Sequence, residues 1–298
     1  MYDIIIIGAG PAGISAAIYG KSRGKKVLVL EKNKVGGLIG NVSTVTHYTA
    51  IIKEESGSTF AQRMKEQALD AEVEIRIENV TGTKLTGEIK QVITDRESYE
   101  SRTVILANGG SGRMLGIPGE NLQGVRLNAP KDGPDYKGRN VYVVGGADGA
   151  VKEALYLSKI AERVTIVCVE DELACIPEFK ERAVKCDNIS VMPHSSLTAV
   201  YGSGRAEELE FTDNRTGEKH TVKDAQCGVF VYAGIVPNTQ MYAELKLDGG
   251  YIPTDDSMQT EIPGVFAAGD IRVKKVRQVA TAVADGAIAG IHAAAMCR

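Results

Sequence analysis

The chain has 298 residues, a formal net charge of -3 and ordinary proportions of apolar and charged side chains. This length is sufficient for two domains, each with a hydrophobic core of its own. The small net charge argues against nucleic acid or a membrane surface as the main partner, so we expect a protein that binds neither.

The N-terminal segment has the pattern of a strand, a glycine-rich turn and a helix. A strand is predicted at Ile4–Ile7, and the helix that follows the turn is predicted to continue through Tyr19. Between them, Gly8, Gly10 and Gly13 form a G-x-G-x-x-G motif. The first glycine permits a tight turn, the second lets the backbone approach a pyrophosphate, and the third permits close helix packing. Because the free N–H groups at a helix start favour negative charge, this pattern predicts a dinucleotide site.

An acidic residue follows this motif at the spacing that a ribose requires. The second strand is predicted at Val27–Leu30, and Glu31 stands at its end, about 20 residues after the glycines. A carboxylate there can accept hydrogen bonds from ribose hydroxyls and favours a ribose without a 2'-phosphate. The motif by itself does not separate NAD from FAD.

A second strand, turn and helix unit lies in the middle of the chain. Its strand is predicted at Val141–Val144, its turn at Gly145–Ala150 and its helix as far as Ile160, before a further strand at Val164–Val167. Such β-α-β units place their strands in parallel, with the ligand at the carboxyl ends. Two of them predict an α/β fold of two Rossmann-like, three-layer domains, the second inserted into the first. The predicted domains are residues 1–116 with 245–298 and residues 117–244, and the other strand-like runs are Glu72–Ile77, Thr83–Leu85, Gln91–Thr94, Thr103–Leu106, Ser190–Met192, Glu207–Thr212 and Val229–Val231.

The C-terminal segment indicates which dinucleotide is expected. Residues Thr260–Asp270 resemble the second FAD fingerprint of the pyridine nucleotide-disulfide oxidoreductase superfamily. A strand at Val265–Ala268 delivers Asp270 to a turn, where its carboxylate can hold ribityl hydroxyls. A last helix is predicted from Val279 to about Ala295, and its first N–H groups can face the flavin pyrimidine edge and stabilise an anionic reduced flavin. FAD is therefore the expected cofactor.

The order of these motifs resembles the low-molecular-weight thioredoxin reductases over essentially the whole chain. Val35–Gly37 resembles the flavin-contacting loop of that family, and Thr103–Gly109 resembles its A-T-G strand, with Asn108 in place of threonine. Leu115–Glu120 matches its hinge between domains, and Gly249–Ile252 matches a further segment. The resemblance implies an FAD domain with an inserted NADPH domain, usually in a homodimer. The FAD-binding residues expected from motif and resemblance are Gly8, Gly10, Pro11, Ala12, Gly13, Glu31, Gly37, Leu38, Val80 (through its backbone), Ala107, Asn108, Gly109, Gly269, Asp270, Arg277, Gln278 and Val279.

The redox motif of that family is replaced in this chain. Where the family carries C-A-T-C-D-G, the aligned stretch Asn128–Gly133 reads N-A-P-K-D-G. Asparagine and lysine form neither a disulfide nor a thiolate, so reduction of thioredoxin through this motif is excluded. Lys131 and Asp132 occupy the place of the lost redox centre and are the only candidates for a catalytic role. An unrelated redox pair of Cys168 and Cys175 is disfavoured, because nothing in the sequence places them near a flavin.

The nucleotide motif of the inserted domain also departs from the family. The family reads G-G-G-N-x-A, whereas here Ala147 stands where a glycine lets backbone meet the pyrophosphate, and Asp148 adds negative charge. The H-R-R-x-x-x-R clamp on the 2'-phosphate of NADPH reads C-V-E-D-E-L-A at residues 168–174. Acids at close range repel a phosphate, so NADPH is disfavoured. We favour a domain kept for its fold, with NADH held by Glu170 through its ribose diol as the alternative.

A flavoprotein without the redox dithiol and without the NADPH clamp needs another electron partner. A subgroup that resembles these reductases, the ferredoxin-dependent flavin thioredoxin reductases, has lost nicotinamide binding but retains the dithiol. Arg272, Lys274, Lys275 and Arg277 follow the second FAD motif, and such a basic run can steer a small acidic carrier such as ferredoxin or flavodoxin. The alternative is a solvated loop, with Arg277 serving the flavin.

Three functions are consistent with these residues. The first is an oxidoreductase that passes electrons between FAD and a carrier protein such as ferredoxin or flavodoxin, or another acceptor. The second is an NADH-dependent flavin reductase, oxidase or ferredoxin reductase that uses Glu170. The third is a non-enzymatic, FAD-bound sensor or partner subunit. The sequence favours a flavin-dependent enzyme.

Two further classes of protein are disfavoured. The five cysteines contain no C-x-x-C pair and the four histidines are scattered, so we expect no metal site. No apolar run is expected to approach the roughly 18 residues of a membrane-spanning helix, because the tail Ala287–Met296 is short and contains His292. The strand at Ile4–Ile7 begins so near Met1 that no signal or transit peptide is expected. We therefore expect a cytoplasmic protein.

Overall fold

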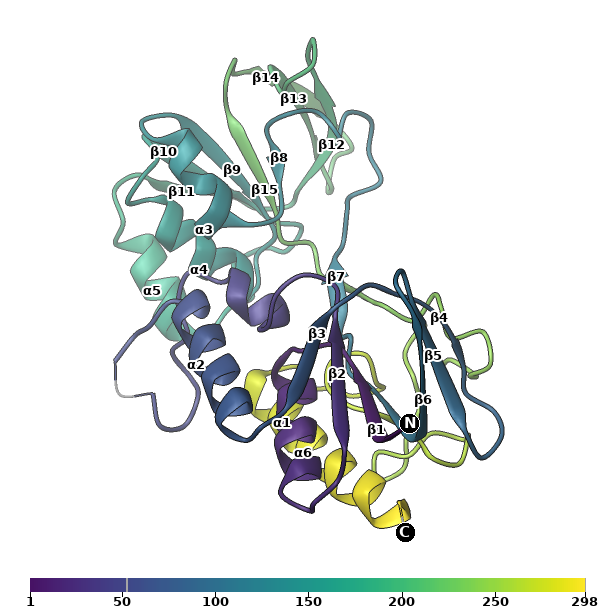
Figure 1. Ribbon diagram of the computed structural model, residues 1–298. Coiled ribbons are helices and arrows are strands. Elements are labelled where there is room, and N and C mark those ends of the chain that lie inside the picture. Colours follow the sequence, from purple (N-terminus) through teal and green to yellow (C-terminus); the bar gives the residue numbers. More distant parts are fainter. Residues whose placement is uncertain (52, 298) are drawn as a thin grey trace. The chain divides into compact units, whose positions relative to one another are not determined.

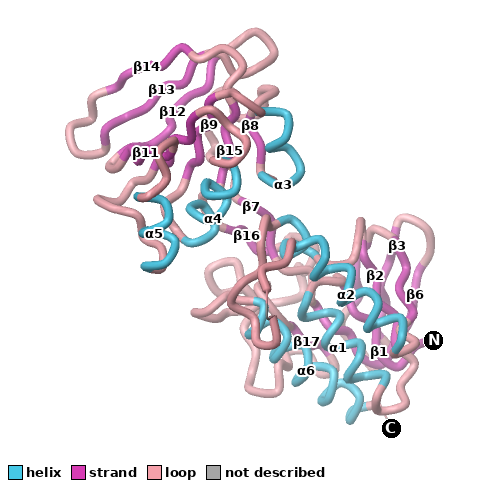
Figure 2. Tube along the Cα trace, turned by 90° about the vertical axis from the view of Figure 1, so that its left-hand side faces the viewer, coloured by secondary structure: helices cyan, strands magenta, loops and turns pink. Residues whose placement is uncertain are grey.

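The computed structural model of the chain describes residues 1–51 and 53–297 and divides into two compact units (Figures 1 and 2). The first unit contains Met1–Gly40, Val45–Ser111 and Val236–Arg298, and the second contains Asn41–Thr44 and Gly112–Ile235. The chain passes between them earlier than the expected limits at residues 116 and 244. These two crossings fall in strands that the sequence did not predict, β7 (Gly110–Gly112) and β16 (Ile235–Pro237), which pair with each other. The chain also enters the second unit briefly at Asn41–Thr44, which the sequence did not predict either.

The first unit is built on a seven-stranded sheet of order β3-β2-β1-β6-β5-β4, with β17 also paired to β6. Strands β3, β2, β1, β6 and β17 are parallel, whereas β5 and β4 continue the sheet in antiparallel pairing. The long strand β6 makes both kinds of pairing, with β5 along Ser98–Ser101 and with β1 along Ser101–Leu106. The strands are β1 Tyr2–Ile7, β2 Val27–Glu31, β3 Glu74–Ile77, β4 Val80–Lys84, β5 Lys90–Thr94, β6 Ser98–Leu106 and β17 Val265–Ala267.

Both faces of the parallel strands are buried. Ile4, Ile5 and Ile6 of β1 are fully buried, although a strand directs successive side chains to opposite faces. Ile5 belongs to a core cluster that includes Tyr242 of the C-terminal segment, while Ile4 lies under α1, next to Gly20. This two-sided burial explains the unbroken apolar run that begins the chain. The helices of this unit are α1 Pro11–Lys21, η1 Gly37–Asn41, α2 Gly57–Asp70 and α6 Val279–Met296.

Helices α1 and α6 pack against each other through glycine (Figure 2). A Cβ on Gly286 would lie 2.1 Å from the carbonyl oxygen of Ala12, and one on Gly290 would lie 2.4 Å from that of Ala16. The Ser15 hydroxyl donates a hydrogen bond of 2.8 Å to a backbone carbonyl of α6. The backbones of the two helices therefore approach as closely as sterics allow.

Helix α6 corrects one expectation from the sequence. It has 18 residues with a mean hydropathy of 1.4, so by length and composition it is able to cross a membrane. The estimate from Ala287–Met296 was wrong because the apolar helix begins eight residues earlier, at Val279. It nevertheless carries a buried charge, Asp285, which pairs with Arg272 and Lys274 at 3.0 and 2.7 Å. That ion cluster and the packing on α1 are the features of a core helix.

The second unit has a parallel sheet of order β11-β10-β9-β15-β8 and a separate antiparallel sheet of order β12-β13-β14. In the parallel sheet, Val143 pairs in register with Ile166 on one side and Phe230 on the other. The strands of the second unit are β8 Val125–Arg126, β9 Asn140–Val144, β10 Arg163–Val167, β11 Ile189–Met192, β12 Ser195–Tyr201, β13 Glu208–Asp213, β14 Lys219–Lys223 and β15 Gly228–Val231. The helices of the second unit are α3 Ala129–Asp132, η2 Gly133–Tyr136, α4 Asp148–Leu157 and α5 Pro177–Val184.

The predicted α/β class, with two Rossmann-like units, is confirmed. Each predicted glycine turn joins a parallel strand to a helix, β1 to α1 and β9 to α4. Helices α2 and α5 and strands β12 and β14 have no counterpart among the predicted elements.

We expect Gly286→Ala to destabilise the first unit by about 1–3 kcal/mol, because its methyl group would overlap the Ala12 carbonyl oxygen. Guanidinium chloride unfolding followed by circular dichroism would register this as a lower midpoint. The matched control is Gly149→Ala in α4, where a Cβ meets no atom within 4 Å and helix propensity favours alanine by up to about 1 kcal/mol. Equal midpoints for the two variants would contradict the close-contact account.

Candidate functional site

The turn between β1 and α1 contains the three predicted glycines in different environments. Gly8 has a φ of 103°, and a Cβ there would lie 2.6 Å from the carbonyl oxygen of Ala107 at the end of β6. A Cβ on Gly13 would lie 1.9 Å from the carbonyl oxygen of Gly8. For Gly10, the nearest such atom of the described chain is 3.9 Å away. Packing therefore requires the first and third glycines, while the second leaves the start of α1 open to a ligand.

Glu31 lies at the carboxyl end of β2, beside this turn, and is 9% exposed. Its Oε2 accepts a hydrogen bond of 2.9 Å from the N–H of Ala9, and its Oε1 accepts one of 3.0 Å from the N–H of Asn33. The two bonds fix the carboxylate at the mouth of the glycine turn. Each oxygen keeps a lone pair for a further donor. The predicted acid therefore lies where it can hold a ribose diol.

The turn after β17 comes against the start of α1. A Cβ on Gly269 would lie 2.9 Å from the Cβ of Ala12. The next residue, Asp270, has a buried Oδ1 without a hydrogen-bond partner in the described part of the chain. Burial raises the pKa of Asp270, against the opposing effect of the Lys274 and Arg277 cations. A buried carboxylate oxygen without a donor is unfavourable, so this site fits a ligand that supplies hydroxyl groups.

The residues before α6 present hydrogen-bond donors. The Arg277 guanidinium lies over the ring of Tyr251, 4.2 Å from the ring centroid. Its Nε is buried, with no partner among the described residues. The N–H of Gln278 donates to the Thr281 hydroxyl at 3.2 Å, and α6 begins at Val279. A helix start with free N–H groups and an unpaired guanidinium suits an electron-rich ligand edge.

The cations of the basic run before α6 are mostly paired inside the first unit, unlike the carrier-docking patch or the solvated loop considered from the sequence. Arg272 and Lys274 both pair with Asp285, and the Lys274 side chain is only 9% exposed. Arg277 is stacked on an aromatic ring, which leaves Lys275 as the exposed cation of the run. Most of the charge expected to attract an acidic carrier is therefore used inside the first unit. Asp285 itself was missed, although an acid within an apolar helix is a readable signal.

Asn108 is committed to bonds within the first unit. Its side-chain N–H donates to the carbonyl oxygen of Asn238 at 2.8 Å, and its Oδ1 accepts from the Tyr242 hydroxyl at 2.7 Å. The Asn238 side chain donates in turn to the Asn108 carbonyl oxygen at 2.7 Å. The side chain expected to contact the flavin thus holds the segment after β16 against the end of β6. Burial raises the pKa of Tyr242, which keeps this phenol a hydrogen-bond donor.

The remaining predicted residues are distributed around the turn. A Cβ on Gly37 would lie 3.3 Å from the Cα of Gly10, so the loop after β2 approaches the glycine motif. Leu38 beside it is 42% exposed. Val80 is the buried first residue of β4, paired with Thr94. The structure therefore brings the glycines, Glu31 and the turn at Gly269 together, and the side chain of Val80 packs into the core.

The second glycine turn, between β9 and α4, is built differently. A Cβ on Gly145 would lie 2.5 Å from the carbonyl oxygen of Tyr232, which repeats the tight contact of the first turn. A Cβ on Gly146 would lie 3.3 Å from Oε2 of Glu170, so this carboxylate is next to the turn. Ala147 is exposed at the start of α4. The Asp148 carboxylate is hydrogen-bonded within the second unit, because its Oδ1 accepts the N–H of Ile176 at 2.8 Å.

The acidic loop after β10 is held by neighbours in the second unit. The carbonyl oxygen of Glu170 accepts the N–H of His194 at 3.1 Å, and the Asp171 carboxylate lies 3.1 Å from the His194 ring. Glu172 pairs with Lys180 at 2.6 Å. Of the three acids, Glu170 is the one beside the glycine turn and has no cationic partner in the described chain. The loop therefore presents a carboxylate to any nucleotide on this turn.

The segment Asn128–Gly133 forms a short turn of helix. The Asn128 side chain accepts the N–H of Lys131 at 3.1 Å, and the N–H of Ala129 donates to the Tyr232 hydroxyl at 3.0 Å. Lys131 is exposed and Asp132 is half-buried. All five cysteines of the chain are free, and none lies in this segment. No group of side chains in the described residues is arranged to hold a metal ion.

A buried acid that the sequence did not reveal lies on α4. Glu153 is 1% exposed, and its Oε1 accepts the N–H of Ser43 at 2.9 Å. Its Oε2 and the Ser43 hydroxyl are buried without partners in the described residues. The neighbouring Lys152 donates to the carbonyl oxygen of Thr44 at 3.0 Å. Burial raises the pKa of Glu153. The bonds from Glu153 and Lys152 hold the segment Asn41–Thr44 within the second unit.

Comparison with known proteins identifies the family. Residues 2–286 match the model of the pyridine nucleotide-disulphide oxidoreductase family. The chain is 40% identical to a thioredoxin reductase of Peptoclostridium acidaminophilum, over 98% of this chain and 96% of that protein. It is 36% identical to a 34.2 kDa protein in the rubredoxin operon of Clostridium pasteurianum, over 98% and 96% of the two chains.

A solved structure extends the similarity to the fold. The crystal structure of Lactococcus lactis thioredoxin reductase in its FR conformation has a TM-score of 0.95 and 34% identity, and the match covers 100% of this chain and 99% of that one. The family implies FAD and a nicotinamide cofactor. The chain therefore belongs to the pyridine nucleotide-disulphide oxidoreductases, as a flavoprotein of the thioredoxin reductase type.

Proposed function

We propose that the chain is an FAD-dependent oxidoreductase that takes electrons from NADH and delivers them to an acceptor outside its own sequence. The observation that carries the proposal is the Glu170 carboxylate, which lies beside the glycine turn of the second unit and has no cationic partner in the described chain. In the first turn, Glu31 occupies the corresponding place after its strand. An acid there suits a ribose diol and not a 2'-phosphate.

The first unit supports FAD through its unpaired groups. Gly10 leaves the start of α1 open for a pyrophosphate, Glu31 is fixed for a ribose, and the buried Oδ1 of Asp270 awaits a donor. The Nε of Arg277 offers a complementary donor. Bound there, FAD supplies the exchange of electrons between a nicotinamide and a second acceptor. We also propose that the chain forms a homodimer, because the thioredoxin reductases that it resembles usually do.

The acceptor is proposed to be external because the chain lacks the dithiol of its relatives. Asn128 and Lys131 stand where those reductases carry their cysteines, and neither residue undergoes thiol–disulfide exchange. The cysteines present are free, and burial raises the pKa of Cys168 and Cys227, which keeps their thiols protonated and unreactive. Lys131 and Asp132 remain candidates for contact with the acceptor, because the short helix exposes the lysine.

The second candidate function is the exchange of electrons between FAD and a small electron-carrier protein, which acts as the electron acceptor or donor. It is favoured by the similarity to a protein of a rubredoxin operon. The basic run before α6 gives it little support, because Arg272 and Lys274 are paired with Asp285. A bound flavin that neither NADH nor a reduced carrier bleaches would instead indicate a non-enzymatic sensor or partner subunit.

NADH is expected to bleach the bound flavin under anaerobic conditions at a concentration at least about 100-fold lower than NADPH. Two like charges about 4 Å apart cost roughly 1 kcal/mol in water and roughly 4 kcal/mol near a protein surface, so the 2'-phosphate is penalised by Glu170. In Glu170→Arg, a guanidinium fork faces that phosphate, and we expect the preference to shift towards NADPH by about tenfold or more. Stopped-flow absorbance of the flavin, followed over a range of NADH and NADPH concentrations, measures the concentration of each nicotinamide that half-saturates flavin reduction.

The matched control for this variant is Glu162→Arg, an exposed acid at the turn before β10 that should leave the preference unchanged. If neither nicotinamide bleaches the flavin in wild-type protein, the NADH proposal is wrong. Reduction by reduced ferredoxin or flavodoxin in the same cuvette then distinguishes a carrier-dependent enzyme from a sensor.

Asp270→Asn is expected to weaken FAD retention while leaving the FAD-free chain as stable as wild type or more stable. The folded-state pKa of Asp270 is raised above its ordinary 3.8, so its charged form costs stability, and that cost appears as the pH rises through this shifted range. The neutral amide removes the cost but accepts fewer hydrogen bonds from a ribityl chain.

Flavin content after gel filtration and thermal unfolding of the FAD-free protein test this prediction between pH 4 and about 8. Asp256→Asn, an exposed acid of the same segment, is the matched control. Full flavin retention in Asp270→Asn would remove this carboxylate from the proposed site.

A further inference from the structure

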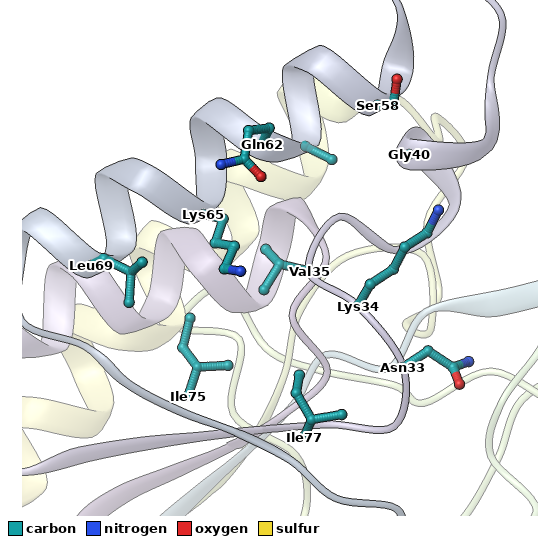
Figure 3. A pocket seen from close by; sticks show the side chains of 11 residues that line it. Asn33, Lys34, Val35, Gly40, Ser58, Gln62, Lys65, Leu69, Ile75 and Ile77 are labelled. Carbon is teal, nitrogen blue, oxygen red and sulfur yellow. The ribbon is translucent and has the colours of Figure 1, made fainter.

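A cavity of about 400 Å³ lies in the first unit between α2, β3 and the loop after β2 (Figure 3). Val35, the first residue of the segment that resembles a flavin-contacting loop, lines it, and no other residue assigned above to FAD does. Its volume is within the usual range of small-molecule sites. The cavity is therefore a separate feature of the fold with no role in the function proposed so far.

The cavity exists because one face of α2 does not close onto the sheet edge. The buried stripe of this helix contains Phe60, Ala61, Met64 and Ala68. The adjoining stripe, with Lys65 and Leu69, runs along the cavity, where Ala61 is too small to fill the space. On the opposite wall, side chains two residues apart on β3 share one face, as the period of a strand requires.

The walls of the cavity combine exposed aliphatic side chains with the polar residues Asn33, Ser58 and Gln62. Figure 3 shows Ile75 and Ile77 of β3 pointing towards α2, with Val35 and Leu69 on the other sides. Leu69 is 53% exposed and Ile77 is 46% exposed. Two large apolar side chains that meet at one hollow and stay in contact with water favour burial by an apolar ligand.

Two lysines border the cavity without counter-ions in the described chain, and their ammonium groups point in different directions (Figure 3). Lys65 directs its ammonium group from α2 towards Val35, and Lys34 extends along the rim towards Gly40 (Figure 3). Neither ammonium group has an ion pair or a hydrogen bond to another part of the described chain, in contrast to Lys152, Lys180 and Lys274. A lysine in the middle of a helix face that meets an apolar strand places positive charge where packing would favour leucine or methionine.

We propose that this cavity binds a small amphipathic carboxylate. Its carboxylate head pairs with Lys65, and its hydrocarbon body lies on Val35, Ile75 and Ile77. A single negative charge matches walls in which aliphatic side chains lie beside lysine and which lack the arginine fork that a phosphate prefers. A second copy of the chain is a poorer occupant. In an isologous contact, the cavity of one subunit would face the same cavity of the other and leave both unfilled, and the lysines of the two subunits would repel each other.

The test uses the full chain loaded with FAD and octanoate as the probe, titrated by isothermal calorimetry. Octanoate is expected to saturate one site, and both octylammonium and acetate are expected to bind at least about tenfold more weakly, since each lacks one of the two determinants. Lys65→Gln is expected to weaken octanoate binding by about tenfold, the loss of one charge-assisted contact. The matched control, Lys32→Gln, removes an exposed lysine of the same loop outside the cavity and should change the affinity less than about twofold.

Circular dichroism and flavin absorbance show that each variant is folded and loaded. The proposal is overturned if octanoate gives no saturable heat up to about 10 mM, or if octanoate and octylammonium bind equally. Equal losses in Lys65→Gln and Lys32→Gln would overturn it as well. Binding to FAD-free protein alone would assign the cavity to the FAD site, and dissociation of a dimer by octanoate would assign it to a second copy.

Discussion

The close approach of backbones at the first glycine turn is the constraint on which the first unit depends. Gly13 meets the carbonyl oxygen of Gly8, while Gly286 meets that of Ala12, so α1 is fixed by β1 and by α6 at the same time. A methyl group at either contact would move the helix off the sheet. Because α1 cannot shift, its N-terminus stays at the carboxyl edge of β1, where Glu31 and the turn after β17 also arrive. A sheet edge, a helix start and an acid therefore meet through packing alone, before any ligand is present.

The distribution of buried charge follows from that geometry. Asp285 enters the unit on α6, and it is neutralised by Arg272 and Lys274 and by the N–H of Gly269. Breaking such a buried cluster costs about 3–5 kcal/mol, so these cations are not available to a partner at the surface. Asp270, only one residue beyond Gly269, has no comparable partner for its Oδ1. The unit therefore satisfies the carboxylate that serves its fold and leaves unsatisfied the carboxylate at the proposed flavin site.

The sequence predicted those parts of the structure that local chemistry determines. The glycine turns, the strands at Ile4–Ile7 and Val141–Val144 and the acid Glu31 follow from periodicity and spacing, and the two Rossmann-like units follow from them. Helix α2 was missed, although Ser56 caps it and its apolar stripe is regular, because no glycine motif drew attention to it. The acid Asp285 was a readable signal within an apolar helix, but its pairing with Lys274, 11 residues away, depends on how the turn before α6 folds back. The burial of Glu153 was not predictable, since its hydrogen bond joins residues 110 apart in sequence. Long-range partners of charged side chains are what a local pattern does not contain.

The two glycine turns show how one sequence pattern yields two different local arrangements. Each begins with a glycine pressed against a backbone carbonyl oxygen, Gly8 on Ala107 and Gly145 on Tyr232. They diverge two residues later, where the first turn has open Gly10 and the second has the methyl group of Ala147. The acids diverge too, since Glu31 is buried and held by two backbone N–H groups, whereas the exposed Glu170 is held through its own backbone. A site with fewer fixed contacts binds its ligand less tightly and releases it faster. The first turn thus suits the proposed prosthetic group, FAD, and the second suits the proposed exchanging ligand, NADH.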